Sequence, residues 1–255
     1  MKKNLFKTYL LVIIQLIFTS FLTASTLNLP LSLNPSRLNP ILSNDEASNE
    51  ISQWLFNGLF KYNKNGKLTN DLASSYKFES KTKLIINLRK DVYWHDGVKL
   101  TSKDILYTYN SIINPKIFIS FKSDYQKVKS VKAIDDYTIE IIYTKPYFKA
   151  LEIWMVGILP FHNYKNEKDM MTSKYNKSPI GTGPYKLGSF QSGKDIKLVA
   201  NKNYFDGKPK IEEINYSLIL DPSTSFLMLK KNRLDIGKLS AIQMNRQINN
   251  KFKED

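Results

Sequence analysis

The side chains that could perform chemistry are few and scattered along this 255-residue chain. It has no cysteine, which excludes disulfides, thiolate metal sites, cysteine nucleophiles and a lipid-modified amino-terminal cysteine. The two histidines, His95 and His162, lie far apart and in no metal-ligand spacing. His95, in a Trp-His-Asp-Gly turn, could bind a metal ion or a carboxylate, but the absence of partner ligands favours a local hydrogen bond. We therefore predict no metal site.

Three other patterns resemble catalytic motifs only superficially. Asp135-Asp136 and Glu212-Glu213 are pairs of adjacent acids, but adjacent side chains on a strand or turn point apart and do not form a dyad. Residues 181–183 (Gly-Thr-Gly) resemble a phosphate loop but lack the following Lys-Ser/Thr and are broken by Pro184. Neither a nucleophile elbow nor a zincin motif is present. The chain is predicted not to be an enzyme, and no cofactor is expected.

The first 25 residues have the parts of a secretory signal. Three lysines precede an apolar run over residues 9–22, and small residues follow, so cleavage is predicted near Ala24 or Ser25. Fourteen residues are fewer than the ~18–20 that span a bilayer, although an uncleaved membrane anchor is the alternative. We predict an exported periplasmic protein that is not a lipoprotein.

The formal charge is +15, or +12 without the three lysines of residues 1–25. Such a charge suits nucleic acid, an anionic membrane or acidic ligands. The lysines are scattered singly or in pairs and form no block of five, so we predict a solvated basic surface and no nucleic-acid partner. A basic protein that binds membrane surfaces is an alternative, and it predicts salt-sensitive binding to anionic vesicles.

Hydrophobic periodicity and cap residues predict a mixed α/β chain of one or two domains. Ser43 or Asn44 can cap the first helix, and Asp45 and Glu46 suit the positive end of its dipole. Residues 101–104 resemble a capping box, and residues 221–223 begin with an Asp cap followed by Pro at the first helical position. Residues 163–178, rich in lysine and without periodicity, are predicted to be a surface loop or linker. The predicted helices cover residues 43–58, 101–113, 148–159 and 221–232, and the predicted strands cover residues 59–62, 75–78, 83–89, 128–133, 138–143, 196–200, 211–220 and 233–237.

A series of short motifs occurs in order at residues 38–40, 55–59, 71–76, 86–97, 101–105, 131–138, 179–185, 203–210 and 234–236. Together they resemble the extracellular solute-binding proteins of family 5, the oligopeptide, dipeptide and nickel receptors of ABC importers. The most specific match is residues 86–97, which end in Trp94-His95-Asp96-Gly97 and look like the family signature.

The resemblance implies a class II periplasmic binding protein-like fold, in which two lobes close on a ligand and perform no chemistry. By resemblance, residues 26–50 and 176–237 form the core sheet of lobe I, and residues 51–175 form an inserted α/β subdomain. Residues 238–255 look like the start of the hinge crossover, with lobe II missing. The strand at 211–220 is then expected to expose an unpaired edge.

The resemblance also places ligand contacts at Asn44, Asp45 and Glu46. Their backbone groups could add β-type hydrogen bonds to an extended peptide, although they could instead simply cap a helix. The implied function is capture of peptides in the periplasm by a monomer that serves ABC permease and ATPase subunits. The alternatives are a nickel or metal-chelate receptor of the same family and a truncated gene product that binds nothing.

Overall fold

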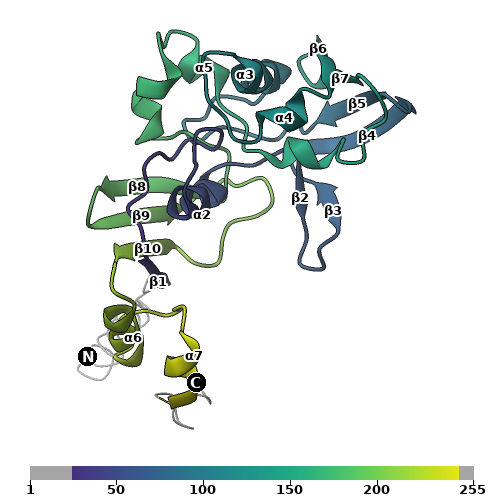
Figure 1. Ribbon diagram of the computed structural model, residues 1–255. Coiled ribbons are helices and arrows are strands. Elements are labelled where there is room, and N and C mark those ends of the chain that lie inside the picture. The colour runs from purple at the N-terminus through teal and green to yellow at the C-terminus, as the bar shows by residue number, and fades with distance from the viewer. Residues whose placement is uncertain (1–24, 247–255) are drawn as a thin grey trace, which may run out of the picture.

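The computed structural model describes residues 25–246, which form a mixed α/β structure with two four-stranded sheets (Figure 1). The first, here called the core sheet, has the order β1-β10-β9-β8, with β1 at Thr26–Leu31, β10 at Glu213–Leu218, β9 at Asp195–Ala200 and β8 at Tyr185–Gln191. The second, here called the outer sheet, has the order β4-β5-β7-β6, with β4 at Ala73–Ser80, β5 at Lys83–Leu88, β7 at Thr138–Tyr143 and β6 at Val128–Asp135. A separate hairpin pairs β2 (Phe60–Tyr62) with β3 (Leu68–Asn70).

The core sheet joins segments from both ends of the described chain. β1 pairs in parallel with β10, and Leu31 lies opposite Leu218, whereas β10, β9 and β8 are antiparallel. β10 therefore has a neighbour on each side, and the expectation of an unpaired edge at residues 211–220 is wrong. β1 occupies the side of β10 that was expected to be unpaired, so the edge strands of this sheet are β1 and β8.

The predicted strand at residues 233–237 is also wrong. This segment lies beside β1, but within residues 25–246 a single backbone–backbone hydrogen bond joins the two, from Asp235 N to Asn28 O at 2.9 Å. The aspartate side chain takes up the neighbouring donor, Asn28 N. A side-chain acceptor thus stands where a second strand would supply a carbonyl.

The outer sheet follows the predicted alternation. Leu84 and Ile86 on β5 lie opposite Ile141 and Ile139 on β7, and all four are fully buried. Helix α3 (Ser102–Ile113) contacts β6, and its predicted capping box is confirmed by the hydrogen bond from Thr101 N to Asp104 Oδ2 at 2.8 Å.

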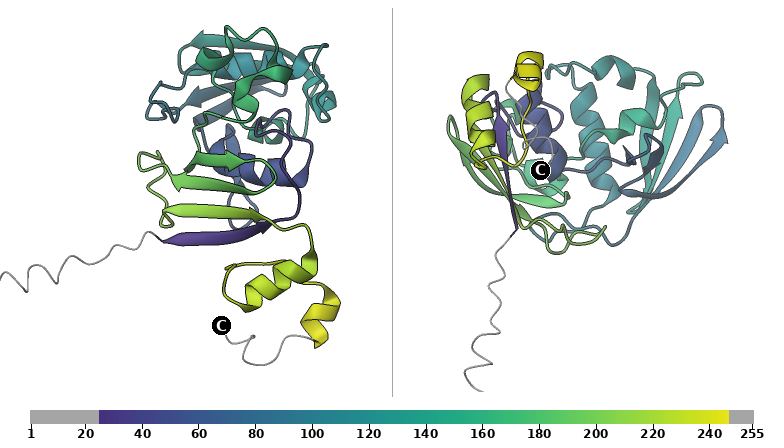
Figure 2. Two further views of the ribbon diagram at one scale, coloured as in Figure 1. Left: turned by 90° about the vertical axis from the view of Figure 1, so that its left-hand side faces the viewer. Right: turned by 90° about the horizontal axis from the view of Figure 1, so that it is seen from below.

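The remaining helices are short. Figure 2 shows α6 and α7 beyond the β1 edge of the core sheet. Asp221 caps α6 by accepting from Ser223 N and Thr224 N, as the Asp-Pro signal predicts. The bounds are α2 at Glu46–Leu55, α4 at Lys122–Tyr125, α5 at Phe161–Tyr164, α6 at Pro222–Lys230, α7 at Ala241–Arg246, and 3-10 turns η1 at Glu152–Met155, η2 at Met170–Thr172 and η3 at Lys174–Asn176.

The predicted helix at residues 148–159 is wrong, because only the turn η1 forms there. Gly157 passes so close to Pro40 and Phe56 that an added Cβ would lie 2.7 Å and 2.8 Å from their Cβ atoms. The chain beyond it is extended, and Ile158 N donates to Asn57 O at 3.0 Å. Tertiary hydrogen bonds have replaced the helical ones.

The predicted surface loop at residues 163–178 is partly wrong, because several of its side chains are buried. Tyr164 stacks on Tyr107 with ring centroids 5.7 Å apart. Asn176 accepts from Asn39 Nδ2 at 3.1 Å through its side chain and from Leu38 N at 2.7 Å through its backbone. The segment closes over residues 38–40 instead of lying free on the surface.

Part of the predicted organisation lies outside the described residues. The secretory signal at residues 1–25 does so except for Ser25, as do the last nine residues of the expected crossover. The division into core sheet, insertion and crossover stays a prediction. Between residues 25 and 246, no helix combines the length and apolar character needed to cross a membrane.

Candidate functional site

Helix α2 begins at the segment that carries the predicted ligand contacts. The predicted cap at Ser43 or Asn44 is wrong: Asp45 is the N-cap, because its Oδ1 accepts from Ser48 N at 2.7 Å. Oδ2 accepts from the hydroxyls of Ser48 and Ser36, both at 2.7 Å. Burial by itself raises the pKa of Asp45, but these hydrogen bonds outweigh it and lower the pKa. The carboxylate of Asp45 thus caps the helix and fixes the preceding loop.

The two residues on either side of Asp45 are differently placed. Asn44 and Glu46 are exposed, and within residues 25–246 the Asn44 side chain makes no hydrogen bond. Glu46 Oε1 lies 2.5 Å from Lys238 Nζ, in an ion pair whose two side chains are 65% and 82% exposed. Such exposed pairs contribute little to stability, so Glu46 can exchange partners at small cost. Contact of these residues with a ligand stays a prediction.

A cavity of about 300 Å³ opens where the parallel strands β1 and β10 end. Ligands of open α/β sheets bind in the crevice beyond the carboxyl ends of such strands. The walls are mostly apolar with a few polar groups, a composition typical of small-molecule sites. The lining residues are Leu29, Pro30, Ser32, Glu50, Ile219, Leu220, Pro222, Ser225, Ile236, Gly237 and Lys238.

Glu50 connects the cavity to the buried face of α2. Its carboxylate lies near Tyr216, whose hydroxyl accepts from Trp54 Nε1 at 2.9 Å. Burial first, and then the neighbouring charge of Glu50, raise the pKa of Tyr216 well above its ordinary value. The phenol therefore stays neutral and rigidly held. The sequence gives no sign of Glu50, because the cavity that it lines forms only where β1 lies beside β10.

The Gly-Thr-Gly loop at residues 181–183 packs on the other end of α2. Gly183 N donates to Leu55 O at 2.8 Å, which satisfies one of the last carbonyls of the helix. A Cβ at Gly181 would lie 1.7 Å from Leu55 O, and one at Gly183 would lie 2.3 Å from Trp54 O. These glycines allow close approach to the helix end, so the superficial likeness to a phosphate loop has a structural cause.

His95 holds the same loop. Its Nδ1 accepts from Gly181 N at 3.1 Å, and Nε2 lies 3.0 Å from Gly183 O. The expected hydrogen bonding is confirmed, but the partners lie 86 and 88 residues away and are not local. Burial lowers the pKa of His95 to about 4, so the ring is neutral near pH 7.

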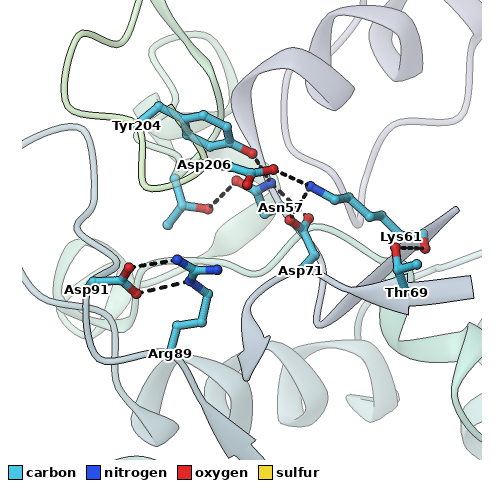
Figure 3. A network of polar contacts seen from close by, with 9 residues as sticks. Asn57, Lys61, Thr69, Asp71, Arg89, Asp91, Tyr204 and Asp206 are labelled. Carbon is cyan, nitrogen blue, oxygen red and sulfur yellow. Dashed lines mark hydrogen bonds and ion pairs between the residues drawn. The ribbon is translucent and has the colours of Figure 1, made fainter. Parts of the chain in front are cut away.

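A polar network joins the segments around α2 (Figure 3). Asn57 Nδ2 donates to Asp71 Oδ2 at 2.8 Å and to the Tyr204 hydroxyl at 3.0 Å. Lys61 Nζ lies 3.1 Å from Asp71 and 3.0 Å from Asp206. Burial raises the pKa of Asp71, although Asn57 and Lys61 oppose that effect. The members bind one another, which indicates a structural cluster.

The paired acids singled out in the sequence, and His162, make ordinary structural contacts. Asp135 Oδ1 accepts from Tyr137 N at 2.7 Å within its turn, and Glu213 pairs with Lys197. His162 Nε2 lies 2.8 Å from Asp96 Oδ2. Among residues 25–246, no group of three His, Asp or Glu side chains could hold a metal ion.

The model of a protein family, described as bacterial extracellular solute-binding proteins, family 5 Middle, matches residues 67–255. Among curated proteins, the chain is 29% identical to the oligopeptide-binding protein AppA of Bacillus subtilis over 213 residues, which are 81% of this chain and 39% of AppA. It is 26% identical over 203 residues to the glutathione-binding protein GsiB of Escherichia coli, or 77% of this chain and 39% of GsiB.

Solved structures of similar proteins also match most of this chain and less than half of their own length. NikZ from Campylobacter jejuni, in complex with Ni(L-His), superposes with a TM-score of 0.81 and 31% identity, covering 88% of this chain and 45% of NikZ. AppA from Bacillus subtilis, in complex with a nonapeptide, gives a TM-score of 0.80 and 28% identity, covering 86% of this chain and 45% of AppA. The chain therefore spans less than half the length of these relatives.

Proposed function

Because this chain belongs to the bacterial extracellular solute-binding proteins of family 5, we propose that it forms the first lobe of a peptide-binding component of an ABC importer. The chain covers 39% of AppA, so peptide capture is proposed for the protein of which this lobe is part. The lobe binds and presents the ligand and performs no chemistry.

The observation that carries the proposal is the crevice beyond β1 and β10. It combines an apolar cavity of about 300 Å³ with the exposed start of α2. An apolar cavity accepts side chains of varied shape, whereas the backbone at residues 44–46 can bind a peptide main chain without reading its sequence. This division of roles suits a receptor for peptides of mixed composition.

Within the predicted set of ligand contacts, the roles differ. The Asp45 carboxylate is occupied by Ser36 and Ser48, so we assign it to holding the segment in shape. Asn44 and Glu46 are exposed, and we assign the ligand contacts to them. Glu46 would exchange Lys238 for a cationic group of the ligand.

A metal chelate is the second candidate ligand. It is favoured by the likeness to NikZ, whose structure contains Ni(L-His), at 31% identity. The described part of this chain offers no group of three side chains for a metal ion. A chelate would therefore bind here through its organic part, in the same crevice.

Calorimetry distinguishes these candidates. We expect the purified chain to release measurable heat with a pool of di- to pentapeptides, and Glu46→Gln to reduce the affinity severalfold. Glu79→Gln is the matched control, because Glu79 also forms an exposed lysine ion pair, with Lys83, but on the outer sheet. Heat with nickel-histidine and none with peptides would favour the chelate. No heat with either would favour the alternative of a chain that binds nothing.

The partners follow from the proposed role. We propose ABC permease and ATPase subunits in the membrane, a periplasmic location reached through the signal at residues 1–25, cleavage near Ala24 or Ser25 without lipid attachment, and a monomeric state. Neighbouring reading frames that encode permeases with many apolar spans would support the importer. The nucleotide sequence after codon 255 would show whether a second lobe is encoded there.

A further inference from the structure

Two segments meet at His95. One is the turn at residues 94–97, which follows β5 of the outer sheet, and the other is the loop at residues 179–184, which leads into β8. Three hydrogen bonds join them: His95 N donates to Gly181 O at 2.8 Å, and the two ring nitrogens contact Gly181 N and Gly183 O. The partly buried imidazole thus bridges two segments that are far apart in sequence.

The contacts define which ring nitrogen carries the proton. Gly181 N is a donor, so Nδ1 must be the unprotonated acceptor, and Nε2–H donates to the carbonyl of Gly183. The neutral ring is fully satisfied in this tautomer. A second proton would sit on Nδ1 and face the N–H of Gly181, so that two donors would meet. The cationic ring cannot keep this contact.

The charged groups around His95 act in opposite directions. Lys186 on β8 donates from Nζ to His95 O at 2.8 Å, and its charge opposes protonation of the ring. The adjacent Asp96 favours protonation, but its Oδ2 lies 2.8 Å from His162 Nε2. Burial and Lys186 together outweigh the hydrogen bond to Gly183 O and the charge of Asp96, so the pKa of His95 is lowered to about 4.

The loop that His95 holds is also fixed to α2, since Gly183 N donates to Leu55 O at 2.8 Å. We propose that His95 is a proton-sensitive latch: its neutral ring fastens the turn at residues 94–97 to the loop at residues 179–184, and protonation breaks the contact with Gly181 N and loosens this loop. Asn57 also contacts the loop, through the Thr182 hydroxyl at 3.1 Å, and this contact carries no titratable group. This contact and the hydrogen bond from Gly183 N to Leu55 O do not depend on pH, so we expect the change to be confined to this loop and both sheets to stay folded.

Nuclear magnetic resonance on the full chain tests the latch. The ring signals of the two histidines are titrated, with His162→Gln as the matched variant that identifies His95. In parallel, exchange protection of the Gly181 amide is measured from pH 7 to pH 3.5 and corrected for the intrinsic rate. The amides of Leu84 and Ile141, in the buried centre of the outer sheet, report whether the fold persists.

We expect the protection of Gly181 to fall at least tenfold as His95 titrates near pH 4, in the wild-type chain and in His162→Gln alike, while Leu84 and Ile141 stay protected. In His95→Gln, Gly181 protection should be low and independent of pH. The latch is refuted if Gly181 protection is unchanged while His95 titrates, or if His95 titrates near pH 6.5. The first two proteins decide the question even if His95→Gln does not fold.

Discussion

Asp235 binds both backbone groups that Asn28 presents at the outer edge of β1. Its N–H donates to Asn28 O at 2.9 Å, and its Oδ2 accepts from Asn28 N at 2.6 Å and from Asn28 Nδ2 at 3.2 Å. Pro30, two residues further along, faces the same edge and has no N–H to offer. Neither residue leaves a donor for an added strand, which is how natural sheets protect their edges.

This edge closure predicts that Asp235→Ala lowers the free energy of unfolding by about 1 kcal/mol, the net value of a typical hydrogen bond. The variant should also self-associate more, because Asn28 N becomes available for intermolecular strand pairing. Urea unfolding and light scattering measure the two effects. Asp136→Ala is the control, since Asp136 is an exposed turn aspartate away from the core sheet. Equal behaviour of the two variants would contradict the role of Asp235.

The cap of α2 predicts a second effect on stability. Asp45→Ala removes the acceptor for Ser48 N and both serine hydroxyls, so it should cost about 1–2 kcal/mol in the free energy of unfolding. Asp45→Asn should cost less, because asparagine caps helices well. Denaturant titration near pH 7 checks the order, and an Asn variant less stable than the Ala variant would contradict the capping role.

The lowered pKa of Asp45 also gives this effect a pH dependence. The stabilisation by the ionised cap is present above the ordinary value of 3.8 and is lost as pH falls through the lower pKa of the folded state. The difference between the wild-type chain and Asp45→Asn should therefore shrink below pH 4.

How much the sequence predicts depends on how local the cause is. The capping box of α3 and the alternation of β5 and β7 involve residues a few positions apart, and both are confirmed. The helix predicted at residues 148–159 fails because Gly157 must pass Pro40 and Phe56, which lie about 100 residues away. Periodicity carries no information about such a contact.

The candidate site shows the same limit. Cap residues predict a helix in this segment but place its cap one or two residues too early, at Ser43 or Asn44 instead of Asp45. Glu50 and Lys238 come together with Ser32 only once β1 lies beside β10. The motif at residues 181–183 is conspicuous in the sequence, but its role at the end of α2 depends on the carbonyl of Leu55, about 130 residues earlier. Resemblance to a family located these segments, and the contacts explain them.

The close packing of the 181–183 loop on α2 predicts a strong effect of small substitutions. Gly183→Ala would place a Cβ 2.3 Å from a backbone carbonyl oxygen, which cannot move without shifting α2. We expect a loss of about 3 kcal/mol or more in the free energy of unfolding. Gly237→Ala is the matched control, because its Cβ meets only the end of the Leu229 side chain, at 3.1 Å, and should cost less than about 1 kcal/mol. Similar losses in both variants would show that the loop can move.

The partly buried, neutral imidazole of His95 predicts that stability falls on acidification. The ordinary pKa of histidine is 6.5 and that of folded His95 is about 4. Between these pH values the His95 ring is protonated in the unfolded chain and neutral in the folded chain. Stability must then decrease as pH falls from 6.5 to 4, by up to about 3 kcal/mol for this group, and no further below pH 4.

The raised pKa values of Asp71 and Asp104 change the free energy of unfolding with pH in the opposite direction. Both residues are present in every variant, so their effect cancels when variants are compared. Urea unfolding at pH 7 and pH 4.5 should therefore show a larger loss in the wild-type chain and in His162→Gln than in His95→Gln, and equal losses in all three would mean that His95 is protonated freely in the folded chain.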